Sequence, residues 1–212
     1  YIKNGYYHIY NRGVEKRIIF LDHQDYGVFL SYLKEYLLPK NEKELYERLS
    51  DPKISSVEKN KVLKSLQLNN FSQEITLLAY CLMPNHFHFF LKQKSTGSID
   101  NFMNSLATRY TMYFNRKYKR VGHLYQGVYK AVLITSEKQF IHLSRYIHKQ
   151  ALPHKPSSYN DYLGKNKTLW LNPEEVLEYF SKSNPLLSYE NFVVESKNDI
   201  VLKNLTLDEN SL

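Results

Sequence analysis

The chain has little cysteine and no long apolar run, and both absences narrow what kind of protein it is. Its one cysteine, Cys81, excludes an intramolecular disulfide and argues against a zinc site built from thiolates. Because Cys81 lies in an apolar stretch, we expect a buried thiol in a reducing compartment. No signal peptide and no run of membrane-spanning length is visible, so we expect a soluble, cytoplasmic protein without a membrane partner. The first residue is Tyr1 rather than Met, which suggests a trimmed or incomplete N-terminus.

Acidic residues are also missing from one long stretch, residues 101–136. The whole chain carries a formal net charge of +8, which suggests a polyanionic partner but does not separate DNA, RNA and membrane surfaces. Basic side chains can follow a phosphate backbone, and tyrosines between them can stack on unpaired bases. We therefore predict a surface for single-stranded or hairpin DNA, although a solvated basic helix face with partly buried tyrosines would leave the same pattern. The basic residues are Arg109, Arg116, Lys117, Lys119, Arg120 and Lys130, interleaved with Tyr110, Tyr113, Tyr118, Tyr125 and Tyr129.

A Pro-Asn turn at residues 84–85 leads into a strand over residues 86–92 that contains two histidines. Side chains alternate across a strand, so His86 and His88 share one face, while Phe87, Phe89 and Leu91 share the other. Two imidazoles about 7 Å apart on one face can bind one divalent metal ion, but they can equally be ordinary sheet histidines. The motif alone does not decide between these two interpretations.

A helix is predicted over residues 136–150, downstream of the two histidines. Ser136 followed by Gln139 has the spacing of a capping box, and Pro153 ends the helix. Tyr146 and Gln150 are four residues apart, so both project from the same side. This places a phenol one turn from an amide oxygen that can ligate a hard or borderline metal ion.

Four segments in this order resemble the HUH single-tyrosine transposases, and among them the REP-associated tyrosine transposases. They are residues 7–13 (YHIYNRG), 83–91 (MPNHFHFFL), 122–127 (GHLYQG) and 145–147 (RYI), with a later likeness at 157–164. The resemblance covers most of residues 1–155. It implies that His86 and His88 are metal ligands, that Tyr146 is the nucleophile and that Gln150 is the third ligand. The family often ends this helix with Asn-Pro, whereas this chain has Gln-Ala-Leu-Pro at residues 150–153.

The resemblance also implies an activity. The tyrosine attacks a phosphodiester of single-stranded DNA, leaving a 5′-phosphotyrosine link and a free 3′-hydroxyl, so that strands are transferred during transposition. A phenol with a pKa of about 10 needs a metal ion or a base nearby to act as a nucleophile at neutral pH. The expected cofactor is Mg²⁺ or Mn²⁺, and the expected partner is single-stranded or hairpin DNA in the prokaryotic nucleoid. Asn11, Arg12, Arg109 and Lys130 are hypothetical DNA contacts, and a monomer and a homodimer are both open.

The order of predicted elements is strand, helix, hairpin, helix, strand, helix, which is that of a ferredoxin-like α+β domain with an antiparallel sheet. The strands are expected at residues 6–12, 75–83, 86–92 and 127–134. Helices are expected at 22–38 and from Ser98, as its cap, to about Tyr118. We expect the catalytic domain to span residues 1–155, with a charged insertion at about 40–72 that is helical or partly disordered. A helical C-terminal extension is expected at 156–212, with helices near 173–180 and 187–194.

Three other functions share some of these features. A nucleic-acid-binding module of the same fold that has lost catalysis would not need His86, His88, Tyr146 and Gln150 together. A replication initiator or relaxase shares the site but usually has a larger chain. A metallohydrolase would need a carboxylate base beside the histidines, and none is evident.

Overall fold

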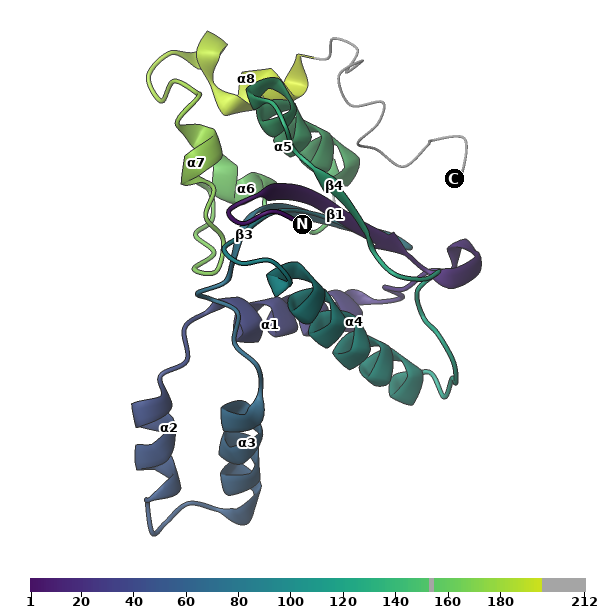
Figure 1. The fold of residues 1–212 in the computed structure, drawn as a ribbon, viewed down its shortest axis with the longest axis vertical. Helices are drawn as coiled ribbons and strands as arrows, with labels where there is room; N and C mark the ends of the chain where they lie inside the picture. The colour runs from purple at the N-terminus through teal and green to yellow at the C-terminus, as the bar shows by residue number, and fades with distance from the viewer. Residues whose placement is uncertain (153–154, 196–212) are drawn as a thin grey trace.

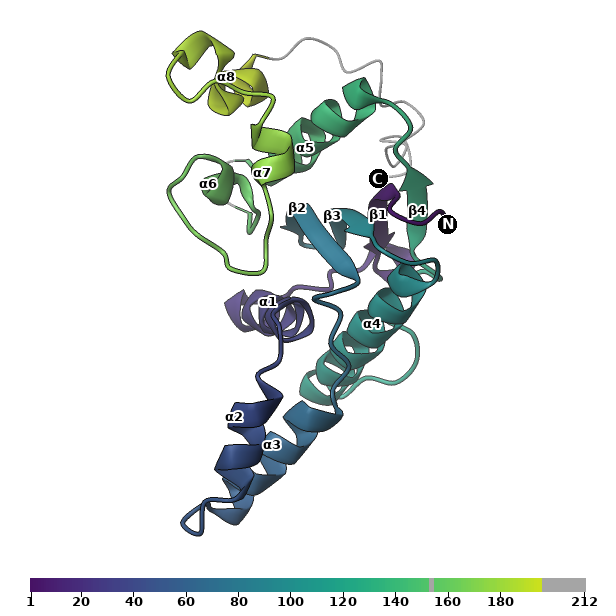
Figure 2. The ribbon, with the colours of Figure 1, turned by 60° about the vertical axis from the view of Figure 1, so that its left-hand side comes forward.

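The computed structural model describes residues 1–152 and 155–195, in which a four-stranded antiparallel sheet separates two layers of helices (Figures 1 and 2). The strand order is β2-β3-β1-β4, and each pair of neighbours is antiparallel. This is the ferredoxin-like α+β arrangement that the order of elements predicts. The strands are β1 (Tyr6–Arg12), β2 (Ile75–Met83), β3 (His86–Gln93) and β4 (Lys130–Leu133), the last shorter than the expected 127–134.

Helices α1 (His23–Leu37) and α4 (Ser98–Lys117) cover one face of the sheet, and α5 (Glu137–Ala151) covers the other (Figure 2). Asp22 caps α1 through a capping box with Asp25, because each side chain accepts a hydrogen bond from the other's backbone N–H. The prediction that Ser98 caps α4 is wrong. The cap is Gly97, whose φ of 88° lies in the left-handed region that glycine adopts without strain, and Ser98 is the first helical residue.

Helix α5 begins after Ser136, whose side chain accepts a hydrogen bond from the Gln139 backbone at 3.2 Å. The Gln139 side chain accepts instead from the backbone of Thr135, one residue before the cap. An apolar stripe that includes Phe140, Leu143 and Ile147 buries the helix against β2 and β3.

Strand β2 is apolar on both faces, which predicts a central strand, but it is one of the two edge strands of the sheet. Both of its faces are nevertheless covered by helices. Its outer edge is also covered, because Leu82 N donates to Pro156 O (2.9 Å) and Ser158 N donates to Tyr80 O (3.1 Å). The segment after α5 thus protects an edge that would otherwise present unpaired backbone groups.

The charged insertion forms two helices, α2 (Glu42–Leu49) and α3 (Ser56–Gln67), which extend away from the sheet (Figure 1). Asn41 and Ser55 cap the two helices with their side chains. Only Val62 is buried within them, so the pair contributes little to the domain core.

The C-terminal part of the described chain folds over α5 and the β2 edge rather than apart from them (Figure 2). Its elements are α6 (Tyr159–Tyr162), α7 (Glu174–Leu177), a 3-10 turn (Pro185–Leu187) and α8 (Tyr189–Val194). The predicted helix at 173–180 is therefore shorter than expected, with Pro173 as its cap. The part of the expected extension at residues 196–212 lies outside the described residues.

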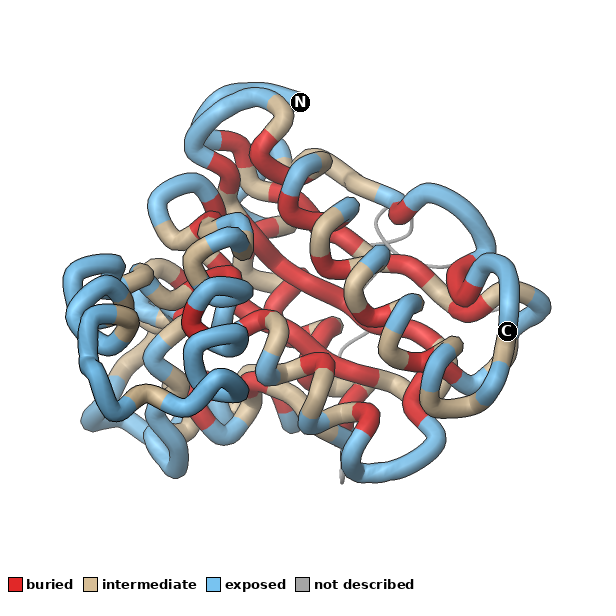
Figure 3. The backbone as a smooth tube through the Cα atoms, turned by 90° about the horizontal axis from the view of Figure 1, so that it is seen from below, coloured by how far each residue is buried: buried red, intermediate tan, exposed pale blue. Residues whose placement is uncertain are grey.

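Two buried clusters, one on each face of the sheet, form the core. Buried residues follow the strands through the middle of the molecule (Figure 3). The larger lies under α1 and α4, and the smaller, which contains Cys81, lies under α5 and the C-terminal helices. Cys81 is fully buried, as its apolar surroundings predict. In the described part of the chain, no helix has the length and apolarity needed to cross a membrane.

Candidate active site

Strand β3 directs its two histidines toward the α5 face of the sheet. His86 and His88 are opposite Arg12 and Tyr10 of β1, while Phe87 and Phe89 belong to the core under α1 and α4. His88 is fully buried and His86 is 6% exposed. The alternation expected from the sequence therefore holds.

Both histidine rings are held through Nδ1. His86 Nδ1 lies 2.6 Å from Asn85 Oδ1, and His88 Nδ1 lies 2.9 Å from His8 Nε2. The rings of His8 and His88 stack with centroids 5.1 Å apart, and those of His86 and His88 meet edge to face at 5.0 Å. Nδ1 of each ring is thus occupied, and Nε2 of His88 is buried without a hydrogen-bond partner.

Both rings are neutral at physiological pH. Burial, and then the nearby Arg12 guanidinium, lowers the pKa of His86 to about 4. Burial, and then the neighbouring His8 and His86, lowers the pKa of His88 well below its usual range. A neutral imidazole is the form that binds a metal ion.

Helix α5 places Tyr146 over this histidine cluster. Its ring centroid lies 5.5 Å from that of His88 and 5.9 Å from that of His8, edge to face in both cases. Tyr146 is half-buried, whereas its neighbours Arg145 and Ile147 are buried. The structure therefore brings together the phenol and the histidine pair, which are some sixty residues apart in the sequence.

The histidine cluster has nitrogen groups that fit a divalent cation. The two neutral imidazoles supply nitrogen ligands, and the unpartnered Nε2 of His88 is a buried polar atom of the kind that a ligand satisfies. Gln150 follows Tyr146 by one turn of α5 and is half-buried. Within residues 1–152 and 155–195, no three His, Cys, Asp or Glu side chains form a metal cluster.

A basic groove lies beside the histidines on the same face of the sheet. It has a volume of about 300 Å³ and is lined by residues of β1, β4 and the loop before β4. Arg12 donates a hydrogen bond to Gln126, and Asn11 Nδ2 donates to Gly127 O at 3.0 Å. Lys130 is exposed opposite Tyr10. Two of the predicted DNA contacts, Arg12 and Lys130, are therefore on the face of the histidines, while Asn11 lines the same groove but alternates to the other face of β1.

The other predicted DNA contacts lie on or just after α4, which covers the opposite face. Two of them are ion-paired within the chain: Arg109 contacts Glu35 at 2.7 Å, and Lys117 contacts Asp22 at 2.7 Å and Asp25 at 2.8 Å. Arg120 donates to Asn115 at 2.8 Å. Arg116 and Lys119 are exposed.

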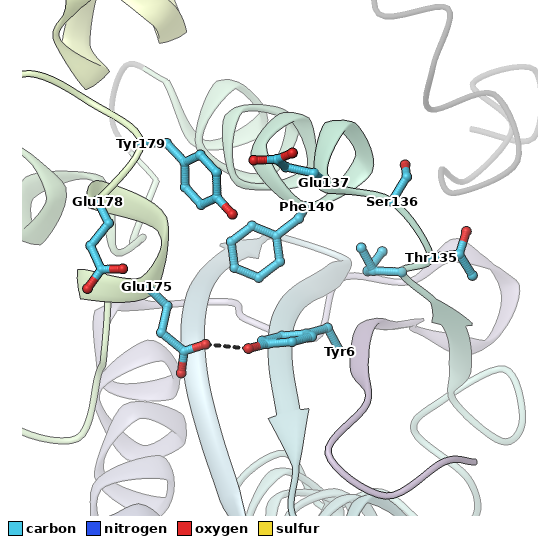
Figure 4. A pocket seen from close by; sticks show the side chains of 9 residues that line it. Tyr6, Thr135, Ser136, Glu137, Phe140, Glu175, Glu178 and Tyr179 are labelled. Carbon is cyan, nitrogen blue, oxygen red and sulfur yellow. Dashed lines mark hydrogen bonds between the residues drawn. The ribbon is translucent and has the colours of Figure 1, made fainter.

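A second cavity, of about 550 Å³, lies at the N-terminal end of α5 (Figure 4). Its walls include three carboxylates, Glu137, Glu175 and Glu178, and Tyr6 donates a hydrogen bond to Glu175. Neither the histidines nor Tyr146 line it. Its negative charge does not suit a phosphate backbone.

The structure adds three residues that the motifs do not single out. His8 and Asn85 hold the two histidine rings, and the ring of Tyr10 lies 4.9 Å from that of His8 and 5.8 Å from that of His88. Period-two alternation in β1 places His8, Tyr10 and Arg12 on one face, which is visible in the sequence. The register that sets Tyr10 opposite His88 is not visible there.

Comparison with known families gives a match over residues 53–150, to the family described as transposase IS200-like. This region includes His86, His88, Tyr146 and Gln150 but not His8. Residues 53–150 are therefore similar to IS200-like transposases. No curated protein matches the sequence significantly.

Solved structures with detectable likeness to the chain include two transposases. One is a REP-associated tyrosine transposase bound to a REP hairpin, with 11% identity, a TM-score of 0.46, and coverage of 81% of this chain and 93% of that one. The other is a putative transposase from Deinococcus radiodurans, with 17% identity, a TM-score of 0.29, and coverage of 71% and 93%. Neither is close enough to transfer the role of a residue.

Proposed function

We propose that the protein cleaves single-stranded DNA with Tyr146 as the nucleophile and transfers the strand through a 5′-phosphotyrosine intermediate. The observation that carries this proposal is the position of Tyr146 over His88, whose Nε2 is buried and unpartnered. The family match over residues 53–150 supports it independently.

The reaction exchanges one phosphodiester for another. The Tyr146 oxygen bonds to phosphorus, the bond from phosphorus to the 3′ oxygen breaks, the phenol loses its proton, and the 3′ oxygen takes one up. The bond energy is kept in the tyrosine ester, so a free 3′-hydroxyl can rejoin the strand without ATP. His86, His88 and Gln150 would hold Mg²⁺ or Mn²⁺, which would neutralise charge on the scissile phosphate.

The groove of Arg12 and Lys130 is the proposed path of the DNA strand to Tyr146. It lies on the same face of the sheet as the histidines, and two cationic side chains there can contact phosphates. Tyr10 supplies an aromatic face beside them for an unpaired base. Arg109 and Lys117 are proposed to stabilise the α1 and α4 layer instead, because their charges are already paired.

The proposed substrate is a DNA hairpin with a single-stranded flank, like the hairpin bound by the REP-associated transposase. The test incubates the protein with Mn²⁺ and hairpin oligonucleotides from the flanks of its own gene, followed by denaturing gels. A label at the 3′ end should remain with the protein, whereas a label at the 5′ end should leave on a fragment with a free 3′-hydroxyl. The opposite pattern would contradict a 5′-phosphotyrosine link.

The nucleophile is tested with matched tyrosine variants, because the chain has 19 tyrosines. Tyr146→Phe should reduce the adduct by at least about 10⁴-fold, as loss of a nucleophile does in other enzymes. Tyr179→Phe removes a hydroxyl at the acidic cavity and should leave the adduct unchanged. DNA binding without an adduct, equal in wild type and Tyr146→Phe, would favour the catalytically silent binding module.

A further inference from the structure

The two histidines of the site are each held by a neighbour at Nδ1, and these neighbours have no role in the proposed reaction so far. Asn85 Nδ2 donates to Lys16 O at 3.3 Å, which turns Asn85 Oδ1 toward His86. A carbonyl oxygen only accepts hydrogen bonds, so His86 must carry its proton on Nδ1. Its Nε2 then has a free lone pair.

The contact between His8 and His88 leads to the same arrangement. One of the two nitrogens, His8 Nε2 or His88 Nδ1, donates across the 2.9 Å that separates them. If His8 donated, neutral His88 would carry its proton on Nε2, which is buried and has no acceptor. A buried N–H without a partner is costly, so the donor is His88 Nδ1 and the acceptor is His8 Nε2.

We infer that His8 is a positioning residue, which holds the fully buried His88 as its Nδ1–H tautomer and keeps the Nε2 lone pair available for a divalent cation. The inference rests on the proposed function in assigning His88 to metal binding. Ligating histidines commonly donate their other ring N–H to a second group, which fixes the ring and raises its basicity. Here that group is an imidazole on the neighbouring strand, which stacks on the ring that it orients.

Three variants separate positioning from packing. His8→Phe keeps an aromatic ring at this fully buried position but removes the acceptor. His8→Gln restores an acceptor through its side-chain oxygen. His23→Gln removes an exposed histidine at the start of α1, away from the site, and controls for weak surface binding of metal.

The first measurement is the Mn²⁺ dissociation constant of the full chain without DNA, by titration calorimetry. We expect His8→Phe to weaken Mn²⁺ binding by about 10- to 100-fold, the usual effect of losing such a partner. His8→Gln should recover most of that loss, and His23→Gln should match wild type. Equal Mn²⁺ affinity of His8→Phe and wild type would overturn the inference, as would a wild type that binds no Mn²⁺.

The second measurement is the tautomer of His88 in the metal-free protein, from two-bond ¹H–¹⁵N correlation spectra. Wild type and His8→Gln should show the proton on Nδ1. His8→Phe should lose that signature, while its other resonances remain those of the folded protein. A wild-type His88 protonated on Nε2 would contradict the inference. Both measurements omit DNA, so a failure of the DNA adduct assay would count against the proposed cleavage and not against the role of His8.

Discussion

The two faces of the sheet contain similar residue types in different arrangements. Under α1 and α4, aromatic rings such as Phe29, Phe87 and Tyr110 interlock, and the ion pairs there are internal. On the α5 face, two of the three buried imidazoles of the histidine cluster lie against the ring of Tyr146, and the exposed Lys130 lines the neighbouring groove. The same strand, β3, supplies both faces through alternate residues.

Charge and aromatic content alone therefore do not identify the face of the sheet that holds the histidine cluster. The basic and tyrosine-rich α4 lies on the opposite face, where Lys117, Tyr113 and Tyr118 all donate to the buried carboxylate of Asp25. The basic side chains next to the histidines are fewer, but they lie at the groove. The two faces differ at two groups in particular: Lys117 is ion-paired with Asp22 and Asp25, whereas Nε2 of His88 is buried without a hydrogen-bond partner.

Substitutions at the adjacent residues Phe87 and His86 of β3 should have the largest effects, the first on stability and the second on formation of the DNA adduct. Phe87→Ala removes a ring packed against Phe29, Phe89 and Tyr125, and should lower the free energy of unfolding by about 3–5 kcal/mol. His86→Ala should cost less stability but abolish the Mn²⁺-dependent DNA adduct. Urea unfolding and the adduct assay together test this prediction. Equal losses of stability in the two variants would contradict the assignment of one face to the core and the other to the site.

Breaking the polar contacts between α5 and the C-terminal segment should have the next largest effect on stability. His148 is fully buried and bonds to Tyr189 at 2.6 Å and to Ser158 at 2.7 Å, where Ser158 also binds the β2 edge. His148→Leu should cost about 2–3 kcal/mol, because it leaves buried hydroxyl groups with fewer partners. Hydrogen exchange should show reduced protection of the backbone amides in α5 and in residues 156–195, but not in α1 or α4.

The neighbouring Lys149 provides the control for this experiment. It is half-buried and precedes the site's Gln150, so Lys149→Ala should leave exchange in α5 within error of wild type. If His148→Leu weakens both helical layers equally, the two layers form one cooperative unit.

The carboxylate of Asp25 should make the α1 and α4 layer sensitive to acid. Burial raises the pKa of Asp25, but hydrogen bonds from Lys117, Tyr118, the Leu21 backbone and Tyr113 outweigh it and lower the pKa overall. A pKa lower in the folded than in the unfolded state contributes stability above the unfolded value, about 3.9, which is lost as pH falls through the folded value. Stability should therefore decline below about pH 4.

Asp25→Asn tests this pH dependence. It should destabilise the protein by about 2 kcal/mol at pH 7, because charged hydrogen bonds become neutral ones, and the decline in acid should be shallower than in wild type. Thermal unfolding from pH 3 to 7 measures both effects, with the exposed loop residue Asp51→Asn as control. A parallel decline in wild type and Asp25→Asn would assign the acid sensitivity to other groups.

The smallest effect expected is on DNA affinity. Lys130→Gln should weaken binding of single-stranded DNA by a few-fold and reduce the slope of log affinity against log salt by about one, as loss of one phosphate contact does. Lys119→Gln, an exposed lysine after α4, is the matched control and should change affinity less. A larger loss of affinity in Lys119→Gln than in Lys130→Gln would indicate that the DNA binds on the α4 side instead.

Local patterns in the sequence predict most of the elements and the division of β3 into two faces. Alternation over residues 86–92 separates His86 and His88 from Phe87 and Phe89, and capping residues mark the starts of α1 and α5. These signals succeed because each depends on residues a few positions apart. The placement of Tyr146 on a helix with Gln150 follows for the same reason.

Contacts between distant segments are decided only by the fold. The register of β1 against β3 brings His8 to His88 across eighty residues, and nothing local encodes it. The packing of α4 on the far face and the seating of residues 156–158 along β2 likewise depend on where every other apolar surface is buried. Periodicity in the sequence assigns a side chain to one face of a helix or strand. Which element packs against that face depends on how the whole chain buries its apolar surface.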